Sequence, residues 1–143
     1  MKPAPTRAGW LLRGWILSLA LLIPSAVLAD SVAGDRIEKR GVLDDDYYAA
    51  GGVVDIDADV DGDVIVAGGE LLIGHRIAGD LIAAGGTLRI RGNIDDDVRV
   101  TGGELDIDAR IGDDLAASGG SIELATTTTV GGDVWLAGGE VRM

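Results

Sequence analysis

Cysteine and phenylalanine are absent from this chain, and His75 is its only histidine. Without cysteine there are no disulfides and no thiolate ligands for zinc, so a stable fold has to come from an apolar core. Without a second histidine or a nucleophile motif, the usual residues cannot build a zinc site or a catalytic triad. We therefore expect a protein that is not an enzyme and that needs no cofactor.

Basic residues are scarce except at the N-terminus. Three of them precede an uncharged run, residues 14–29, which is broken by Pro24 and ends in small residues before Asp30. This order is typical of a secretory signal peptide, residues 1–29, cleaved after Ala29. An uncleaved membrane anchor is the alternative, but the run falls short of the ~20 residues that span a bilayer. We expect an exported protein of the periplasm or cell envelope.

Acidic residues dominate the remainder of the chain. After removal of residues 1–29 the protein keeps 9 basic and 24 acidic side chains, a formal net charge of −15. Nucleic acid is an unsuitable partner for such a protein, since phosphate binding rests on Lys and Arg. No second long apolar segment follows, so we expect no membrane span in the mature chain.

Glycine pairs recur along the chain at a fixed spacing that is broken once, before the last pair. A fixed period over six copies indicates a repeat protein. In the copy that begins at Asp63, apolar residues alternate at Val64 and Val66 and again at Leu71 and Ile73. This spacing predicts two short strands with those side chains inside. The pairs that mark this period are Gly51-Gly52, Gly68-Gly69, Gly85-Gly86, Gly102-Gly103, Gly119-Gly120 and Gly138-Gly139.

The glycine pair between the two strands predicts a sharp corner. We expect Gly68-Gly69 to adopt backbone angles that residues with a Cβ avoid. Ile77 occupies a third, shorter side, and two extra residues in Thr126–Thr129 account for the one longer interval. Three sides in each repeat predict an all-β solenoid, a β-helix of about six coils over residues 44–143, stacked about 4.8 Å apart.

The two ends of the predicted solenoid differ from its middle. Residues 30–43 do not follow the period and mix charges of both signs, so we interpret them as a linker or an N-terminal cap. The first coil then presents Tyr47 and Ala49. An end coil leaves backbone groups unpaired, and solenoids usually cover it with a polar cap. The last residues are instead another strand, so either the protein continues beyond Met143 or the open end pairs with another molecule.

The segment Asp44-Asp45-Asp46-Tyr47-Tyr48-Ala49-Ala50-Gly51-Gly52, followed by repeats such as Gly79-Asp80-Leu81-Ile82-Ala83-Ala84-Gly85-Gly86, resembles the bactofilin, or polymer-forming cytoskeletal, family. The resemblance covers about residues 44–143. It implies a right-handed β-helix that polymerises end to end without nucleotide. Bactofilins proper are cytosolic, so the export signal makes this chain more similar to secreted bactofilin-like repeat proteins. Many of those continue into membrane helices, and this sequence contains none.

An aspartate opens each coil, at positions 46, 63, 80, 97, 114 and 133. Stacked about 4.8 Å apart, these carboxylates repel one another unless each bonds a backbone N–H or a cation lies between them. We favour a corner residue whose side chain caps its own turn. Weak divalent-cation binding is the alternative, and its candidate ligands are Asp63, Asp80, Asp97 and Asp114, helped by Asp95, Asp96 and Asp113.

Two further motifs resemble functional sites but lack features that those sites require. Asp57–Gly62 matches the first half of an EF-hand calcium loop, but the twelfth position holds Gly68 where the loop needs glutamate. His75 on a corner has the position of the general base in hexapeptide acyltransferases, but the much longer period of this chain does not fit their six-residue repeat. We interpret His75 as a surface residue.

Outward positions indicate contacts rather than chemistry. We expect Arg89 and Arg91 beside Asp106 and Asp108 of the next coil. The site two residues after each opening aspartate is mainly apolar and is interrupted by Arg99. This stripe predicts a lateral contact, or it is partly covered by residues 30–43 or arises by chance. Its members are Tyr48, Ile65, Ile82, Arg99, Ala116 and Trp135.

These patterns predict a non-enzymatic structural protein of the cell envelope that self-assembles through the ends of its β-helix into a homo-polymer or homo-oligomer. The alternative is a monomeric acidic binding module for divalent cations or a cell-envelope ligand. The residues expected to carry assembly are Tyr47, Ala49, Val134, Leu136, Val141 and Met143.

Overall fold

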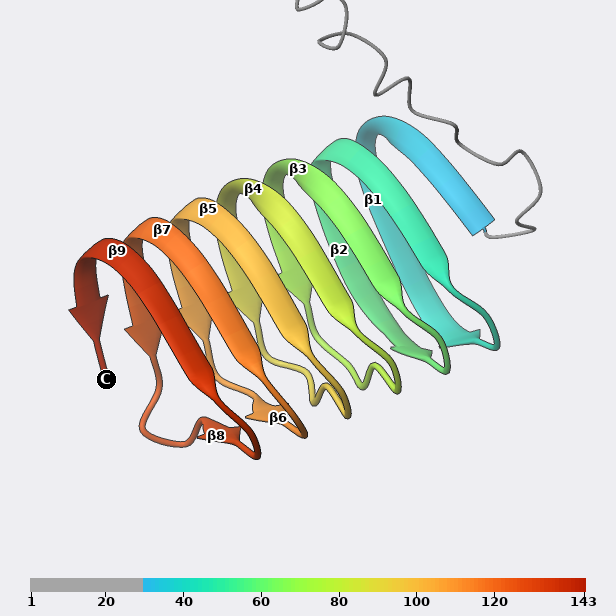
Figure 1. Cartoon of the computed structure of the whole chain (residues 1–143). Coiled ribbons are helices and arrows are strands. Elements are labelled where there is room, and N and C mark those ends of the chain that lie inside the picture. The colour runs from blue at the N-terminus through green and yellow to red at the C-terminus, as the bar shows by residue number, and fades with distance from the viewer. Residues whose placement is uncertain (1–29) are drawn as a thin grey trace, which may run out of the picture.

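The computed structural model describes residues 30–143, which form a solenoid of seven stacked coils. One long strand from each coil joins a parallel sheet in the order β1-β2-β3-β4-β5-β7-β9, and β6 pairs with β8 in a second, two-stranded sheet. Figure 1 shows the long strands side by side along one axis. The predicted all-β solenoid is confirmed. The strands are β1 (Asp30–Leu43), β2 (Tyr47–Val60), β3 (Val64–Ile73), β4 (Leu81–Ile90), β5 (Val98–Ile107), β6 (Arg110–Ile111), β7 (Leu115–Leu124), β8 (Thr129–Val130) and β9 (Val134–Arg142).

Equivalent residues of successive coils lie directly opposite each other. Gly68 of β3 lies opposite Gly85 of β4, which in turn lies opposite Gly102 of β5. The step from β7 to β9 is longer by two residues, yet Gly119 still lies opposite Gly138. A turn takes up the two extra residues, and there the Thr128 N–H donates to the carbonyl of Ala125 at 2.9 Å. The predicted insertion at a corner is confirmed, and the stacking of the strands is undisturbed.

The core is a column of aliphatic side chains, with Tyr47 as its one aromatic member. No polar or charged side chain is buried within residues 30–143. The third side adds a ladder of single bridges, Val60 to Ile77, Ile77 to Ile94 and Ile94 to Ile111. The inward residues predicted from the period are buried in the coils from β2 to β5, whereas Leu124 and Val130 near the C-terminal end are only partly buried. The core therefore thins towards β9.

Residues 30–43 correct the predicted number of coils. They form β1, which pairs with β2 in the register of the repeat, from Asp30 opposite Tyr47 to Leu43 opposite Val60. The interpretation as a linker is therefore wrong, and the solenoid has seven coils rather than six. The segment escaped detection because its corner reads Gly34-Asp35 instead of two glycines. The predicted signal peptide, residues 1–29, lies outside the described residues.

The glycine pairs work differently from expectation. β3 runs through Gly68-Gly69 as one curved strand, and among the described glycines only Gly41 has a positive φ, 105°. The expectation of unusual backbone angles is therefore wrong. Instead, a Cβ at Gly68 would lie 2.6 Å from the carbonyl oxygen of Gly51 in the preceding coil. Glycine is required because the stacked backbones approach too closely for any side chain.

Exposed ion pairs connect neighbouring coils, although not all as predicted. Arg91 lies beside Asp106 as expected, and its guanidinium makes two hydrogen bonds to that carboxylate. Arg89 lies opposite Asp106, also as expected, but it donates its hydrogen bond to Glu70 of the preceding coil at 2.6 Å. Asp108 accepts from the Thr127 hydroxyl. Each exposed pair contributes only about 0–1 kcal/mol. Their main effect is on the register between coils.

Candidate functional site

The opening aspartates form a ladder along one edge of the sheet. Every carboxylate except that of Asp133 in the last coil accepts a hydrogen bond from the backbone N–H of the equivalent aspartate in the next coil, so the charged groups link coils instead of separating them. The bonds run from Asp63 to Asp46 at 2.9 Å, Asp80 to Asp63 at 2.8 Å, Asp97 to Asp80 at 3.1 Å, Asp114 to Asp97 at 3.0 Å and Asp133 to Asp114 at 2.8 Å.

This ladder corrects the expected role of the aspartates. Their side chains do not cap their own turns, because Oδ1 reaches forward by one coil. The backbone of the same corner is also used, since the Tyr47 N–H donates to the carbonyl of Asp63 at 2.8 Å. A hydrogen bond to the charged form of a carboxylate stabilises that form. Stacked aspartates are therefore tolerated without a cation between them.

The Asp63 rung gives a direct test of this role. Asp63→Ala removes the acceptor of the Asp80 N–H, and we expect the free energy of unfolding to fall by about 1–2 kcal/mol. Asp63→Asn keeps an acceptor oxygen at the same place, so its loss should be clearly smaller. Urea unfolding followed by circular dichroism measures both variants. Equal losses for alanine and asparagine would show that the backbone bond is not what the side chain supplies.

Three carboxylates at one corner come closer together than the rest. Asp96, Asp97 and Asp113 each place one oxygen within 4.8 Å of the other two. Carboxylate oxygens are the ligands that calcium prefers, so this cluster has suitable chemistry for a divalent cation. Of the four weakly predicted cation ligands, only Asp97 belongs to it. Asp63, Asp80 and Asp114 remain in their own rungs of the ladder.

The pKa values at this corner shift in opposite directions. The charge of neighbouring Asp114 is the main cause that raises the pKa of Asp113. The pKa of Asp97 is lowered, first by the backbone N–H of Asp114 and further by Arg99. The stability that Asp97 contributes is therefore present above its unfolded pKa and is lost as the pH falls through its lowered folded pKa. Protonation of Asp113 instead relieves repulsion in the folded state.

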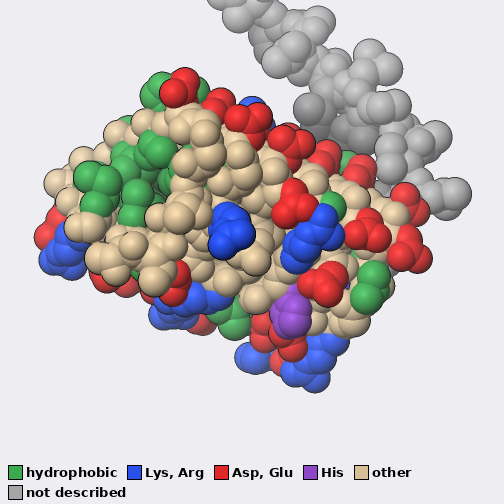
Figure 2. Space-filling view, turned by 90° about the horizontal axis from the view of Figure 1, so that it is seen from below, with side chains coloured by type: hydrophobic (Ala, Val, Ile, Leu, Met, Phe, Trp, Pro, Cys, Tyr) green, Lys and Arg blue, Asp and Glu red, His purple; other side chains and the backbone are tan. Residues whose placement is uncertain are grey.

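The corner that carries His75 brings basic and acidic side chains of two coils together. His75 Nε2 lies 2.9 Å from Asp57 Oδ1, and Nδ1 lies 3.5 Å from Asp59 Oδ1. Arg76 lies 3.7 Å from Asp61. Figure 2 shows the single purple histidine at the surface among red and blue side chains. The aspartates of the EF-hand-like motif therefore face basic side chains of the next coil.

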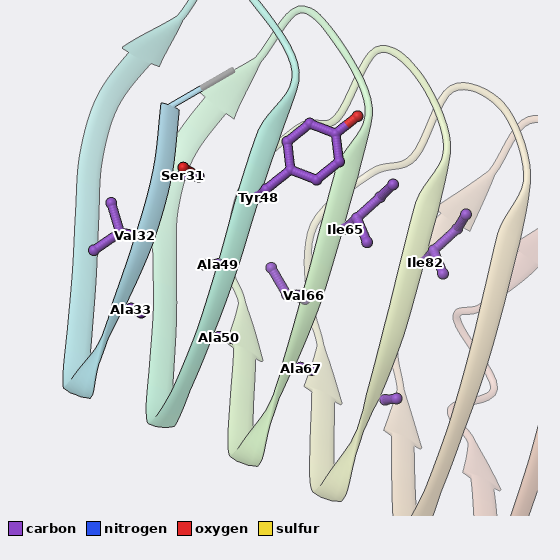
Figure 3. A pocket seen from close by; sticks show the side chains of 11 residues that line it. Ser31, Val32, Ala33, Tyr48, Ala49, Ala50, Ile65, Val66, Ala67 and Ile82 are labelled. Carbon is purple, nitrogen blue, oxygen red and sulfur yellow. The ribbon is translucent and has the colours of Figure 1, made fainter. Parts of the chain in front are cut away.

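The outward stripe lies on one face of the sheet, as predicted. Tyr48, Ile65 and Ile82 occupy the same position in successive strands and project to the same side in Figure 3. Ile65 and Ile82 are 36% and 40% exposed, and Trp135 at the far end is 55% exposed. The interpretation as a stripe covered by residues 30–43 is wrong, because β1 stacks on the end of the solenoid and not over this face.

The residues expected to carry assembly fall into two groups. Tyr47 and Ala49 are buried, because β1 pairs over them, so they do not form the N-terminal end. The C-terminal four lie in or directly after β9 and are at least partly exposed. Val134 is 45%, Val141 39% and Met143 84% exposed, and Leu136 is half-buried.

The N-terminal end is formed by residues that the sequence interpretation missed. β1 presents Arg36 and Glu38, which form an ion pair at 2.9 Å. Val32 is 38% exposed on the same strand. Gly34 precedes Gly51 by one full period, and this spacing is the signal that could have placed the segment in the repeat.

Comparison with known proteins leaves the fold as the firmest description of the chain. No family model, no curated protein and no solved structure matches it. The fold defines a β-solenoid repeat protein. Within residues 30–143 no helix is long and apolar enough to cross a membrane. The likeness to bactofilins therefore stays a prediction from the sequence.

Proposed function

We propose that this chain is a non-enzymatic structural protein of the cell envelope that assembles end to end through its first and last coils. The observation that carries the proposal is the exposure of apolar side chains in β9. Val134 and Val141 occupy positions that are buried in the coils from β2 to β5, yet they are 45% and 39% exposed. Both end strands also have an edge that pairs with no other described strand. Such edges bind further strands through their backbone groups.

Continuing the register of the repeat from β9 into β1 of a second copy gives a specific contact. Gly138 then lies opposite Gly34 of the second copy, because both occupy the corner position of their coils. The same register places Glu140 opposite Arg36 and Arg142 opposite Glu38. Leu136 comes to lie opposite Val32. Opposite charges therefore meet at both charged positions, and apolar residues meet beside the corner.

The charges at this contact are already paired within each end strand. Arg142 donates to Glu140 at 2.6 Å, and Arg36 to Glu38 at 2.9 Å. Joining the ends would put these two pairs side by side with alternating signs. Cross-strand pairs of this kind favour one register, while contributing little affinity when exposed. A head-to-tail contact does not close on itself, so repetition gives a filament.

The sequence supports this proposal independently. Its resemblance to bactofilins implies polymerisation through coil ends without nucleotide, and the predicted signal peptide places that assembly outside the cytoplasm. The net charge of −15 expected after cleavage opposes non-specific association. A specific register at the ends is therefore the route by which such acidic molecules can associate.

Light scattering and negative-stain microscopy of residues 30–143 over a range of concentrations test the proposal. We expect particle size to grow with concentration, into rods or filaments, without calcium. Glu140→Arg places two positive charges opposite each other and should shift growth to at least about threefold higher concentration. Adding Arg36→Glu in the same chain restores opposite charges at every junction and should restore growth.

Glu104→Arg is the matched control, since Glu104 occupies the same position as Glu140 in a central coil. It should leave growth unchanged. A monomer at all concentrations would refute assembly through the ends. If calcium also raised the thermal midpoint of that monomer, and Asp113→Asn abolished the rise, the acidic cluster of Asp96, Asp97 and Asp113 would favour the alternative of a cation-binding module.

A further inference from the structure

The outward face of the sheet is mainly apolar, whereas the rest of the surface is acidic. We call it the apolar face. It consists of two rows of outward residues that run along the solenoid between the aspartate ladder and the glycine corners. Grooves on this face lie over β1 to β4 and over β4 to β9. The first row holds Ser31, Tyr48, Ile65, Ile82, Arg99, Ala116 and Trp135, and the second holds Ala33, Ala50, Ala67, Ala84, Thr101, Ser118 and Ala137.

The aspartate ladder runs along one edge of this apolar face. Each opening aspartate stands two residues before a member of the first row, so both are presented to the same side of the strand. Only Oδ1 of each aspartate takes part in the backbone bonds between coils. The backbone bonds leave the second carboxylate oxygen to other donors. An apolar surface is thus bordered by a line of negative charge with one carboxylate per coil.

Arg99 shows how a cation uses this border. It occupies a first-row position, and its guanidinium reaches back to the ladder. It donates to Oδ2 of Asp97 at 2.6 Å and to Oδ2 of Asp80, in the preceding coil, at 3.4 Å. The Oδ2 atoms, which take no part in the backbone bonds, are therefore the atoms that bind the guanidinium. Arg99 also lines the groove over β4 to β9, and the stems of long basic side chains commonly cover apolar surface.

The neighbouring rungs repeat this arrangement with an apolar residue in place of arginine. Ile65 stands in the same relation to Asp63 and Asp46 as Arg99 does to Asp97 and Asp80. The arginine of the later coil reaches Asp80 and Asp97 but not Asp63. The Asp63 rung therefore combines an exposed isoleucine with a carboxylate that has no arginine in the first row beside it.

We propose that the apolar face binds a cationic amphipathic segment of a partner protein, lying along the solenoid axis. Its apolar side chains would cover Ile65, Ile82 and Trp135. Its Lys or Arg side chains would take the place beside Asp46 and Asp63 that the Arg99 guanidinium takes beside Asp80 and Asp97. An α-helix suits the spacing, because its pitch of about 5.4 Å is close to the coil spacing of about 4.8 Å. A second copy fits less well, since it brings an identical row of carboxylates. This binding is lateral and does not depend on assembly through the ends.

Fluorescence anisotropy with a labelled helical peptide of leucine and lysine tests the inference on the full chain as isolated from expressing cells. We expect saturable binding, and no binding of the same peptide with glutamate in place of lysine. The double variant Asp46→Asn with Asp63→Asn keeps the backbone acceptors and removes two charges. It should weaken binding about threefold to tenfold. Ile65→Arg supplies the arginine from the chain itself and should weaken binding at least as much.

The double variant Glu104→Gln with Glu123→Gln is the matched control, because it removes two exposed charges from another side of the solenoid. It should leave the dissociation constant unchanged. If both double variants weakened peptide binding equally, the binding would be explained by general attraction of a cationic peptide to an acidic protein. That result would overturn the proposal. Absence of peptide binding, together with a particle mass that Ile65→Arg lowers, would assign the face to a second copy and would also overturn it. Circular dichroism of each variant verifies that the fold is retained.

Discussion

Gly85→Val is expected to lower the free energy of unfolding by about 3 kcal/mol. A Cβ at Gly85 would lie 2.5 Å from the carbonyl oxygen of Gly68 and 3.2 Å from Cδ1 of Leu88. The oxygen belongs to the backbone of β3, which pairs with β4 along its whole length. It cannot move away without separating the two coils. Urea unfolding of the purified variant measures the loss.

Gly74→Val is the matched control for this substitution. The nearest atoms to a Cβ at Gly74, in Asp57 and Ile56, lie 3.6 Å away, which is ordinary contact distance. We expect a change within about 0.5 kcal/mol, as for other surface positions. If both variants lost the same stability, flexibility of glycine in the unfolded chain would explain the pairs better than close approach of the coils.

Leu88→Ala should cost about 3 kcal/mol, the second large effect. Leu88 is 1% exposed and lies in the central part of the core. Its removal leaves a cavity between the side chains of the preceding and following coils, which are fixed by their own strand pairing. Thermal unfolding followed by circular dichroism reports this loss as a lower midpoint.

Val141→Ala in β9 is the informative comparison, because Val141 occupies the same position as Leu88 three coils later. With 39% of its surface exposed, it should cost less than about 1 kcal/mol at concentrations where the protein is a monomer. Where assembly occurs, the same change should also shift growth to higher concentration. A loss as large as that of Leu88→Ala in the monomer would mean that β9 is covered within the molecule.

Most of the fold could be predicted from the sequence because glycine pairs and apolar residues recur along it at a fixed spacing. Alternating apolar residues on either side of each glycine pair specify which side chains enter the core. The first coil was missed, since Gly34-Asp35 breaks the pattern of the pairs and only Ile37 of its neighbours is buried. Identical residues reveal a repeat only where they recur. Residues 30–43 lack them and are held in the register of the repeat by strand pairing alone.

The roles of individual residues were harder to predict than their positions. The aspartates were correctly placed at the corners, but the partner of Asp46 is Asp63 of the next coil, beyond any local turn motif. The glycines were correctly placed too, but the reason for them is a backbone atom of another coil. Arg89 lies opposite Asp106 as predicted, but its guanidinium bonds Glu70, because a long side chain can reach acceptors in more than one coil. Contacts between coils depend on how the coils stack. Residues that are close together in the sequence do not determine that stacking.

The strict order of the coils also determines how the molecule carries mechanical load. Each coil pairs only with its neighbours, and the hydrogen bonds between coils run along the long axis. Tension along that axis is shared among all the bonds of one junction, whereas successive junctions carry the same force in series. Extension is therefore limited by the weakest junction, and adding further coils lengthens the rod without making it stronger.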